Sequence, residues 1–233
     1  MISSLLAKLH SSKNWSEDDE PQLWEGIVDD PHQFATWDDV EYCLNNPQFY
    51  SITFINKDEV RFVELPEYER CWSRSTADVE EIMRNWEYGH NLIINNFDQG
   101  FRKKQEIIEQ FEKYFDGKTA FHVYAGLKKC NSFNAHEDTA SNFILQVEGE
   151  THWNVFEERC SGLIEMTDEP YLPDKNNHEL TVALDVTLKA GDVMYIPART
   201  YHKPFPSGKR LSMSIPCMYP LDVESDRKQY VIE

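Results

Sequence analysis

Two histidines and one aspartate in the second half of the chain have the residue types and order needed to hold a metal ion. His136 and Asp138 are separated by one residue, and positions i and i+2 of an extended strand point to the same face. His202 follows a turn glycine, Gly191, and a short apolar strand that ends in a proline. Two imidazoles and one carboxylate form the facial triad of non-haem Fe(II) oxygenases, which leaves coordination positions open. We therefore predict that these three residues are metal ligands.

The elements that must position these ligands read as short strands. We expect strands at 119–126, 142–148, 151–156, 180–188, 193–197 and 210–216, with glycines between or beside them. Short strands separated by turn signals are typical of a β-sandwich or a β-barrel. The residues before them predict helices and fewer strands. The expected fold class is therefore mainly β, a barrel supported by an N-terminal helical layer.

Several elements are expected within residues 1–118. Helices are predicted at the N-terminus, from Thr36 onward, over 77–89, and from an N-cap at Asp98 to just before Gly117. Strands are predicted at 49–56, 59–65 and 91–96. In the helix after Asp98 the apolar residues lie on one side at helical spacing, and we expect this stripe to cover a sheet. They are Ile107, Ile108, Phe111, Tyr114 and Phe115.

Length, charge and cysteine content limit the possible classes of function. The chain has 233 residues, which fits one domain: a buttress at 1–118, a barrel core at 119–216 and a tail at 217–233. Its net charge of −18 argues against direct binding to nucleic acid, because such binding needs Lys and Arg to neutralise phosphates. No apolar run is long enough to span a membrane. Five scattered cysteines without close pairs favour a reducing cytoplasm.

Two segments resemble a known family. The stretch HEDTASNFILQVEGETHW, from His136 to Trp153, resembles the core of JmjC-domain 2-oxoglutarate oxygenases, especially the ribosomal-oxygenase type of protein hydroxylase. The stretch GDVMYIPARTYH, residues 191–202, resembles the strand that carries their distal histidine. The resemblance covers residues 119–216. It implies a double-stranded β-helix (a jelly-roll or cupin barrel), Fe(II) as the metal, and 2-oxoglutarate and O2 as co-substrates.

The resemblance also suggests residues for binding 2-oxoglutarate. Tyr124 stands where related hydroxylases have a tyrosine that contacts the far carboxylate of this co-substrate. Their basic partner stands two residues before the tryptophan, and this chain has Thr151 there instead. Arg210 and Ser212 resemble an Arg-x-Ser element with which other 2-oxoglutarate oxygenases hold the same carboxylate. Arg210 is therefore the expected substitute, and the alternative is a solvent-facing arginine beside the 207–208 turn. Lys203 is a weaker candidate.

The substrate is less constrained than the metal. The leading hypothesis is a dioxygenase that hydroxylates a peptide or protein side chain. A second hypothesis keeps the chemistry but has a free amino acid or another small molecule as substrate. A third, suggested by Thr151, is a cupin-like metal-binding module without oxygenase activity. The sequence does not indicate an oligomeric state.

Overall fold

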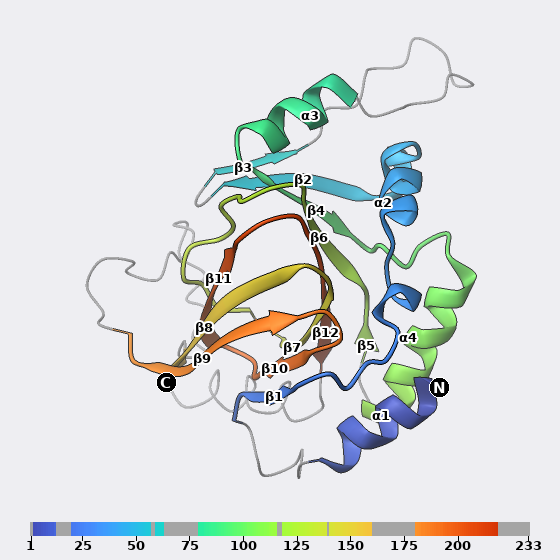
Figure 1. Cartoon of the computed structure of the whole chain (residues 1–233). Coiled ribbons are helices and arrows are strands. Elements are labelled where there is room, and N and C mark those ends of the chain that lie inside the picture. Colours follow the sequence, from blue (N-terminus) through green and yellow to red (C-terminus); the bar gives the residue numbers. More distant parts are fainter. Residues whose placement is uncertain are drawn as a thin grey trace, which may run out of the picture.

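The computed structural model describes residues 2–12, 20–56, 59–62, 79–115, 118–138, 140–159 and 180–218. Two antiparallel sheets face each other as a barrel, and helices lie along the outer side of the larger sheet (Figure 1). The prediction of a mainly β fold with an N-terminal helical layer is confirmed. The end of the predicted strand 59–65, the start of the helix 77–89 and the tail beyond residue 218 lie outside the described residues.

The larger sheet contains most of the strands. Its order is β1 (Gln22–Trp24), β10 (Val193–Ile196), β7 (Ser141–Glu148), β12 (Arg210–Met218), β6 (His122–Gly126), β4 (Asn91–Asn95), β2 (Ser51–Asn56) and β3 (Glu59–Phe62), with β5 (Lys118–Thr119) also paired to β12. The smaller sheet has the order β11 (Thr200–Pro206), β8 (Glu150–Arg159) and β9 (Val182–Lys189). The predicted strand 119–126 is thus divided into β5 and β6.

The strand β11 carries His202 but has no counterpart among the strands predicted from sequence. Pro204 and Pro206 fall within it, and a proline cannot donate a backbone hydrogen bond to a neighbouring strand. Such residues are tolerated at the edge of a sheet, and β11 lies at the edge, with β8 as its one neighbouring strand in the described part of the chain. The edge position therefore permits a strand where the composition alone argues against one.

The helices are α1 (Ile2–Ser11), α2 (Trp37–Leu44), α3 (Val79–Glu87) and α4 (Arg102–Phe115), with 3₁₀ turns at Pro31–Gln33 and Pro47–Phe49. The predicted start of α2 is confirmed, because Thr36 and Asp39 form a reciprocal capping box. The prediction of Asp98 as the N-cap of α4 is wrong. Gly100 adopts a left-handed backbone with φ of 83° and separates Asp98 from the helix, and the Asp98 carboxylate accepts the Phe121 N–H instead. Among the described residues no helix is both long and apolar enough to cross a membrane.

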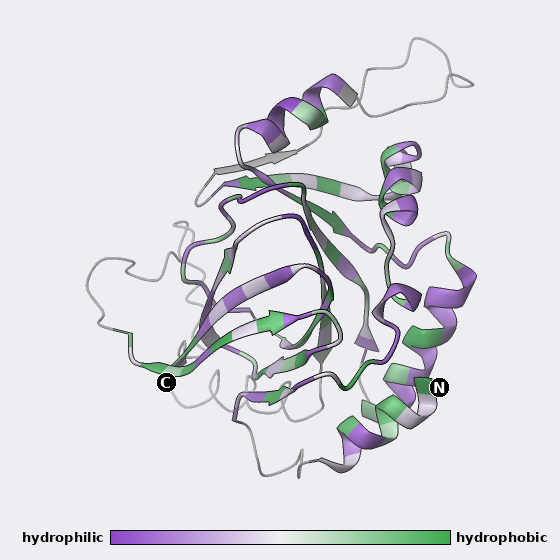
Figure 2. Cartoon of the chain, in the orientation of Figure 1, coloured by the Kyte–Doolittle hydropathy of each residue, from purple (hydrophilic) through white to green (hydrophobic). Residues whose placement is uncertain are grey.

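The central strands β7 and β12 have two buried faces of different character. One face packs against the helices: the Phe143 ring centroid lies 5.2 Å from Phe111 and 4.9 Å from Phe115 of α4. This contact confirms that the apolar stripe of α4 covers a sheet, and Figure 2 shows apolar (green) and polar (purple) residues recurring along this helix. The other face points into the barrel and carries polar residues, including Asn142, Gln146 and Ser212.

Candidate metal centre

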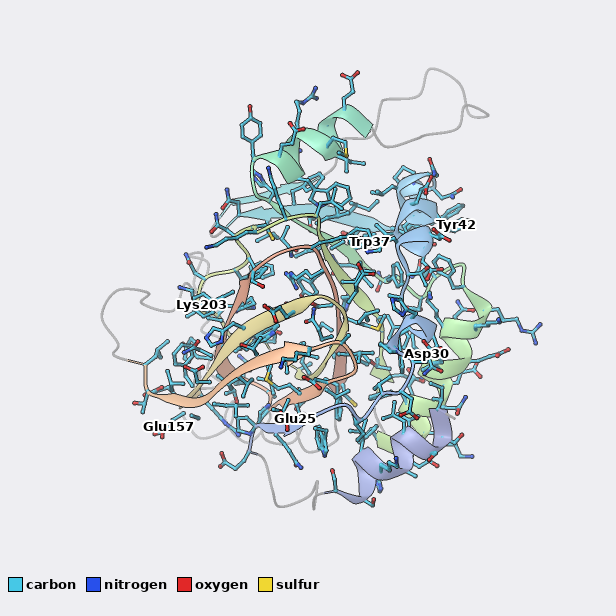
Figure 3. All side chains as sticks on the ribbon, in the orientation of Figure 1. Glu25, Asp30, Trp37, Tyr42, Glu157 and Lys203 are labelled. Carbon is cyan, nitrogen blue, oxygen red and sulfur yellow. The ribbon has the colours of Figure 1, made fainter. Side chains whose placement is uncertain are left out.

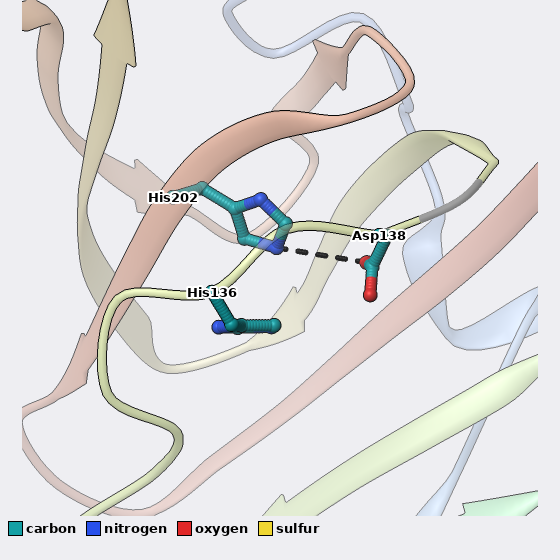
Figure 4. Close-up of side chains that lie close together, drawn as sticks. All are labelled: His136, Asp138 and His202. Atoms are coloured by element: carbon teal, nitrogen blue, oxygen red, sulfur yellow. Dashed lines mark ion pairs between the residues drawn. The ribbon is translucent and has the colours of Figure 1, made fainter. Parts of the chain in front are cut away.

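The three predicted ligands lie together in the structure. One ligand atom from each of His136, Asp138 and His202 lies within 4.8 Å of the others. Nε2 of His202 is 3.6 Å from Oδ2 of Asp138, the pair joined by the dashed line in Figure 4. The two imidazole centroids are 4.3 Å apart. Among the described residues this is the one group of three or more His, Cys, Asp or Glu side chains close enough to share an ion.

The ligands come from two segments that meet through their backbones. His202 lies on β11, whereas His136 forms only an isolated bridge and Asp138 lies in irregular chain before β7. The expectation of a regular strand for the His-x-Asp pair is therefore wrong. Instead the His136 N–H donates to the His202 carbonyl (3.1 Å), and the His202 N–H donates to the His136 carbonyl (2.8 Å). This backbone pairing brings the imidazoles of His136 and His202 next to each other.

Backbone carbonyls fix the tautomer of both histidines. His136 Nδ1 lies 2.8 Å from the Asn134 carbonyl, and His202 Nδ1 lies 2.9 Å from the Thr200 carbonyl. Because a carbonyl oxygen can only accept, each Nδ1 carries a proton here, and Nε2 is the ring nitrogen left to face a metal. Burial, and then the neighbouring His202, lower the pKa of His136 to about 4, which keeps its ring neutral near neutral pH. Two imidazoles and a carboxylate are a donor set that fits a divalent transition metal.

The carboxylate ligand is also oriented by a neighbour. Asn142 Nδ2 donates to Asp138 Oδ2 at 2.7 Å. The Ser214 hydroxyl in turn donates to Asn142 Oδ1 at 2.9 Å, which fixes the direction of the amide. The sequence places Asn142 and Gln146 on one strand face, but the contact with Asp138 depends on the path of the irregular segment. Groups that orient metal ligands in this way commonly tune the affinity for the metal.

A pocket of about 380 Å³ of empty space, part of it open to solvent, extends from the ligands into the barrel. Tyr124, Trp153, Arg210 and Ser212 are among its lining residues. Residues that were predicted from distant parts of the sequence therefore share one cavity with the three ligands. Thr151 is not part of the lining, although its buried hydroxyl lies 3.5 Å from that of Ser212.

Arg210 is buried inside the barrel, so the solvent-facing alternative is wrong. It is only 1% exposed. Nη1 donates to the Ser212 hydroxyl (2.8 Å) and Nη2 donates to Asn91 Oδ1 (3.0 Å), whereas Nε has no hydrogen-bond partner. The Ser212 hydroxyl donates onward to Gln146 Oε1 (2.9 Å). Burial lowers the pKa of Arg210, yet a guanidinium remains charged in proteins.

The neighbours of this guanidinium are neutral. Burial raises the pKa of both the Tyr124 phenol and the Cys130 thiol, so neither forms an anion near neutral pH. No carboxylate among the described residues pairs with Arg210. An unpaired buried charge is unfavourable, and the chain keeps one where it lines the pocket. The pocket therefore has candidate metal ligands at one position and an uncompensated cation at another.

The other polar residues considered from sequence lie outside the ligand set. His152 is on the outer face of β8, where it contacts Thr187 and Asp185. Lys203 lies on the β11 side of the molecule with its ammonium over the Phe205 ring (Figure 3). The side chain of Glu137 is not in the ligand cluster, as expected for the residue between two ligands. His122 accepts a weak hydrogen bond from the Asn96 N–H at 3.4 Å and is not among the pocket residues.

Sequence relatives of the chain are oxygenases. It is 23% identical over 166 residues to ribosomal oxygenase 1 of Danio rerio, covering 55% of this chain and 30% of the relative. It is 32% identical over 123 residues to ribosomal oxygenase 2 of Mus musculus, covering 51% of this chain and 25% of the relative. A bifunctional lysine-specific demethylase and histidyl-hydroxylase of Culex quinquefasciatus is 29% identical, with 55% and 25% covered. The chain thus spans less than a third of the length of these relatives.

Comparison of folds and of family patterns agrees with these relatives. The structure of the ribosomal oxygenase YcfD from Escherichia coli in complex with cobalt and 2-oxoglutarate superposes with a TM-score of 0.59 at 15% identity, covering 97% of this chain and 55% of YcfD. At this identity the likeness shows a shared fold. The family model of the JmjC domain matches residues 94–224, which is more than half of the chain and includes all three candidate ligands. The chain therefore belongs to the JmjC-domain family.

Proposed function

We propose that this chain is an Fe(II)- and 2-oxoglutarate-dependent dioxygenase that hydroxylates a peptide or protein side chain. Membership of the JmjC family and the two-imidazole, one-carboxylate cluster support a mononuclear Fe(II) centre. The names of the relatives, ribosomal oxygenase and histidyl-hydroxylase, support a protein substrate. The reaction would consume O2 and 2-oxoglutarate and convert a substrate C–H bond to C–OH, with succinate and CO2 as the other products.

The observation that carries the proposal is the buried, uncompensated charge of Arg210 in the same pocket as the metal ligands. A dicarboxylic 2-oxo acid has two functions that match these two features. Its oxo-acid end can chelate a metal, and its far carboxylate needs a cation with hydrogen-bond donors. Binding would place an anion beside Arg210 and would remove the cost of its unpaired charge. Among the residues that the structure describes, no comparable feature favours a cupin-like module without activity.

The chain's own residues would divide the work of binding. His136 and His202 would present their Nε2 lone pairs to Fe(II), and Asn142 would hold Asp138 in place for it. When bound, the metal would supply the site at which O2 oxidises 2-oxoglutarate and the substrate. Arg210 and the Tyr124 phenol would bind the far carboxylate. Among the described residues the Tyr124 hydroxyl has no hydrogen-bond partner, so it is available as a donor.

Thr151 suggests why the cation comes from another strand. This residue is fully buried on β8, and its hydroxyl lies 3.5 Å from Ser212 on β12. A position that holds a basic residue in similar hydroxylases therefore lies next to the Arg210 hydrogen-bond network. We propose that Arg210 performs the role of that residue and that Ser212 and Gln146 hold the guanidinium in place.

The proposal is tested by adding Fe(II) and 2-oxoglutarate to the anaerobic protein. We expect a visible metal-to-ligand charge-transfer band, and succinate after O2 is admitted. A His202→Ala variant should give neither signal. A well-folded, metal-loaded protein that gives no band and no succinate would contradict the proposal. Mass spectrometry then tests candidate peptides and free amino acids for a gain of one oxygen atom. The class that gains it identifies the substrate as a peptide or protein, or as a small molecule.

A further inference from the structure

We propose that the ion pair between Arg199 and Glu137, here called the clamp, is a positioning device that assembles the metal ligands before the metal binds. The proposal rests on the metal site proposed above. Neither residue contributes a ligand atom to the cluster. Arg199 lies in the turn between β10 and β11, and Glu137 lies between the ligands His136 and Asp138.

Arg199 has a backbone conformation that arginine rarely adopts. Its φ is 64°, and among the described residues Asn96 is the only other non-glycine with a positive φ. In this left-handed region the Cβ atom crowds the next carbonyl, a strain that glycine avoids and asparagine tolerates. Contacts of the arginine must therefore hold the conformation. Such strained residues are concentrated at functional sites.

Two contacts of Arg199 reach the segment that carries the other two candidate ligands. Its backbone N–H donates to the Asp138 carbonyl at 2.7 Å. Its Nη1 lies 3.9 Å from Glu137 Oε1, and the side chains are only 6% and 13% exposed, respectively. Three residues further on, His202 is placed on β11 and has its ring fixed by the Thr200 carbonyl. The turn thus links the 136–138 segment to the start of the strand that carries the third ligand.

The metal site needs such a link because its two segments share little regular structure. Residues 136–138 form a single isolated bridge with β11 and are not part of a longer ladder. A ligand displaced by a fraction of an ångström binds metal poorly, so neighbouring contacts that hold ligands in place affect the affinity strongly. Glu137 can serve this purpose because its side chain lies outside the ligand cluster. The buried charge pair, together with the hydrogen bond from the Arg199 N–H to the Asp138 carbonyl, would hold the two segments together.

Two single substitutions distinguish positioning from a simple effect of charge. Glu137→Gln removes a negative charge near the metal, and Arg199→Asn removes a positive charge while keeping a residue that tolerates the left-handed backbone. A purely electrostatic influence on a cation would weaken binding in the first variant and strengthen it in the second. The clamp predicts that both variants bind more weakly. The probe is Co(II) alone, titrated into the metal-free full chain and followed by its visible absorption.

A second buried ion pair gives a matched control. Lys104 of α4 lies 2.9 Å from Asp39 of α2, and these side chains are 6% and 20% exposed. They contact none of the metal ligands. Lys104→Met should therefore lower the melting temperature and leave the Co(II) dissociation constant within about twofold of the wild type, because the pair is remote from the ligands. This control separates a loss of stability from a loss of ligand position.

The expected result is a rise in the Co(II) dissociation constant of about tenfold in both single variants, the range typical for groups that orient metal ligands. The double variant should bind no more weakly than the weaker single variant, and its Co(II) spectrum should differ from that of the wild type. Opposite changes in the two variants, or wild-type affinity in both, would overturn the clamp. If Arg199→Asn does not fold, Glu137→Gln and Arg199→Gly make the same test. A wild-type chain that binds no Co(II) would instead overturn the metal site itself.

Discussion

The two ends of the pocket are built in different ways. At the metal end, His136 and Asp138 come from irregular chain and His202 comes from an edge strand. At the other end, Arg210 and Ser212 come from β12, which lies between β7 and β6 inside the larger sheet. The Asp138 side chain is 43% exposed, whereas Arg210 is 1% exposed. The metal end is partly exposed, and few backbone contacts join its two segments. The Arg210 end is enclosed by strands on both sides.

The difference follows from what each end must tolerate without a ligand. Two imidazoles and a partly solvated carboxylate leave no unpaired buried cation, so the metal end can be open and can be completed by the metal–ligand bonds. A buried guanidinium without an anion is unfavourable, so hydrogen bonds to neutral side chains must stabilise it. Asn91, Ser212 and Gln146 provide that network from three adjacent or nearby strands. These hydrogen bonds thus hold the Arg210 guanidinium, which has no carboxylate partner among the described residues.

Removing a metal ligand should have the largest effect and should leave the Arg210 end intact. His202→Ala should weaken Co(II) binding by more than about 100-fold, beyond the range seen for groups that only orient ligands. The cause is the loss of one of three donor atoms. Co(II) titration measures the effect, and His152→Ala on the exposed face of β8 serves as the control. Metal binding by His202→Ala at wild-type affinity would exclude this histidine from the site.

Removing the buried cation should weaken the binding of 2-oxoglutarate and leave the binding of the metal unchanged. Arg210→Met should weaken 2-oxoglutarate binding to the metal-loaded protein by about 10- to 100-fold, because charge-assisted hydrogen bonds contribute about 1.5–3 kcal/mol each. Co(II) affinity should stay within about twofold of the wild type, since Arg210 contacts no metal ligand. The ligand-free variant should melt no lower than the wild type, because it no longer buries an unpaired charge.

Isothermal titration with 2-oxoglutarate and a thermal melt measure the two parts of this prediction. Lys209→Met, which removes the same charge from the neighbouring surface residue, is the control. Unchanged 2-oxoglutarate affinity in Arg210→Met would remove this residue from the co-substrate site. A large fall in the melting temperature would show that the guanidinium is compensated in the ligand-free protein.

Substituting two amide side chains on the same face of β7 should have smaller effects, one on each end of the pocket. Asn142 donates to the ligand Asp138, and Gln146 accepts from Ser212 near Arg210. Asn142→Ala should weaken Co(II) binding by about tenfold, as expected when a ligand loses its orienting group. Gln146→Ala should instead weaken 2-oxoglutarate binding by a few-fold. The dissociation constants of Co(II) and of 2-oxoglutarate are measured for each variant. Equal changes in both constants would mean that the two ends of the pocket are not independent.

The smallest effect concerns pH and Tyr124, which both ends influence. Burial and then the charge of Asp138 raise the pKa of Tyr124, whereas Arg210 opposes the shift. A raised pKa means that the phenol stays protonated, and so remains a donor, as the pH rises through the ordinary value of about 10. 2-Oxoglutarate affinity should therefore be constant between about pH 8 and pH 10. Titrations across this range test it, and a decline centred near an ordinary tyrosine pKa would contradict it.

The sequence predicts the elements that follow simple local rules. Alternating strands, the capping box at Thr36 and the apolar stripe of α4 depend on residues within one or two turns of each other. Two predictions from the sequence failed, and each failure has a physical cause. Asp98 is a good N-cap by type, but Gly100 turns the chain before the helix begins. β11 is hidden by Pro204 and Pro206, which only an edge position permits.

The three candidate metal ligands could be predicted from the sequence alone because residue type decides which side chains can bind a metal, and their spacing resembles a known family. The tertiary structure decided the rest. Arg210 contacts Asn91, which is 119 residues away, and Asn142 reaches Asp138 only through the path of an irregular segment. Arg199 meets Glu137 because a strained turn places them together. Burial and the absence of a carboxylate near Arg210 among the described residues are properties of packing, and they make a residue type that is usually exposed the candidate for binding the far carboxylate.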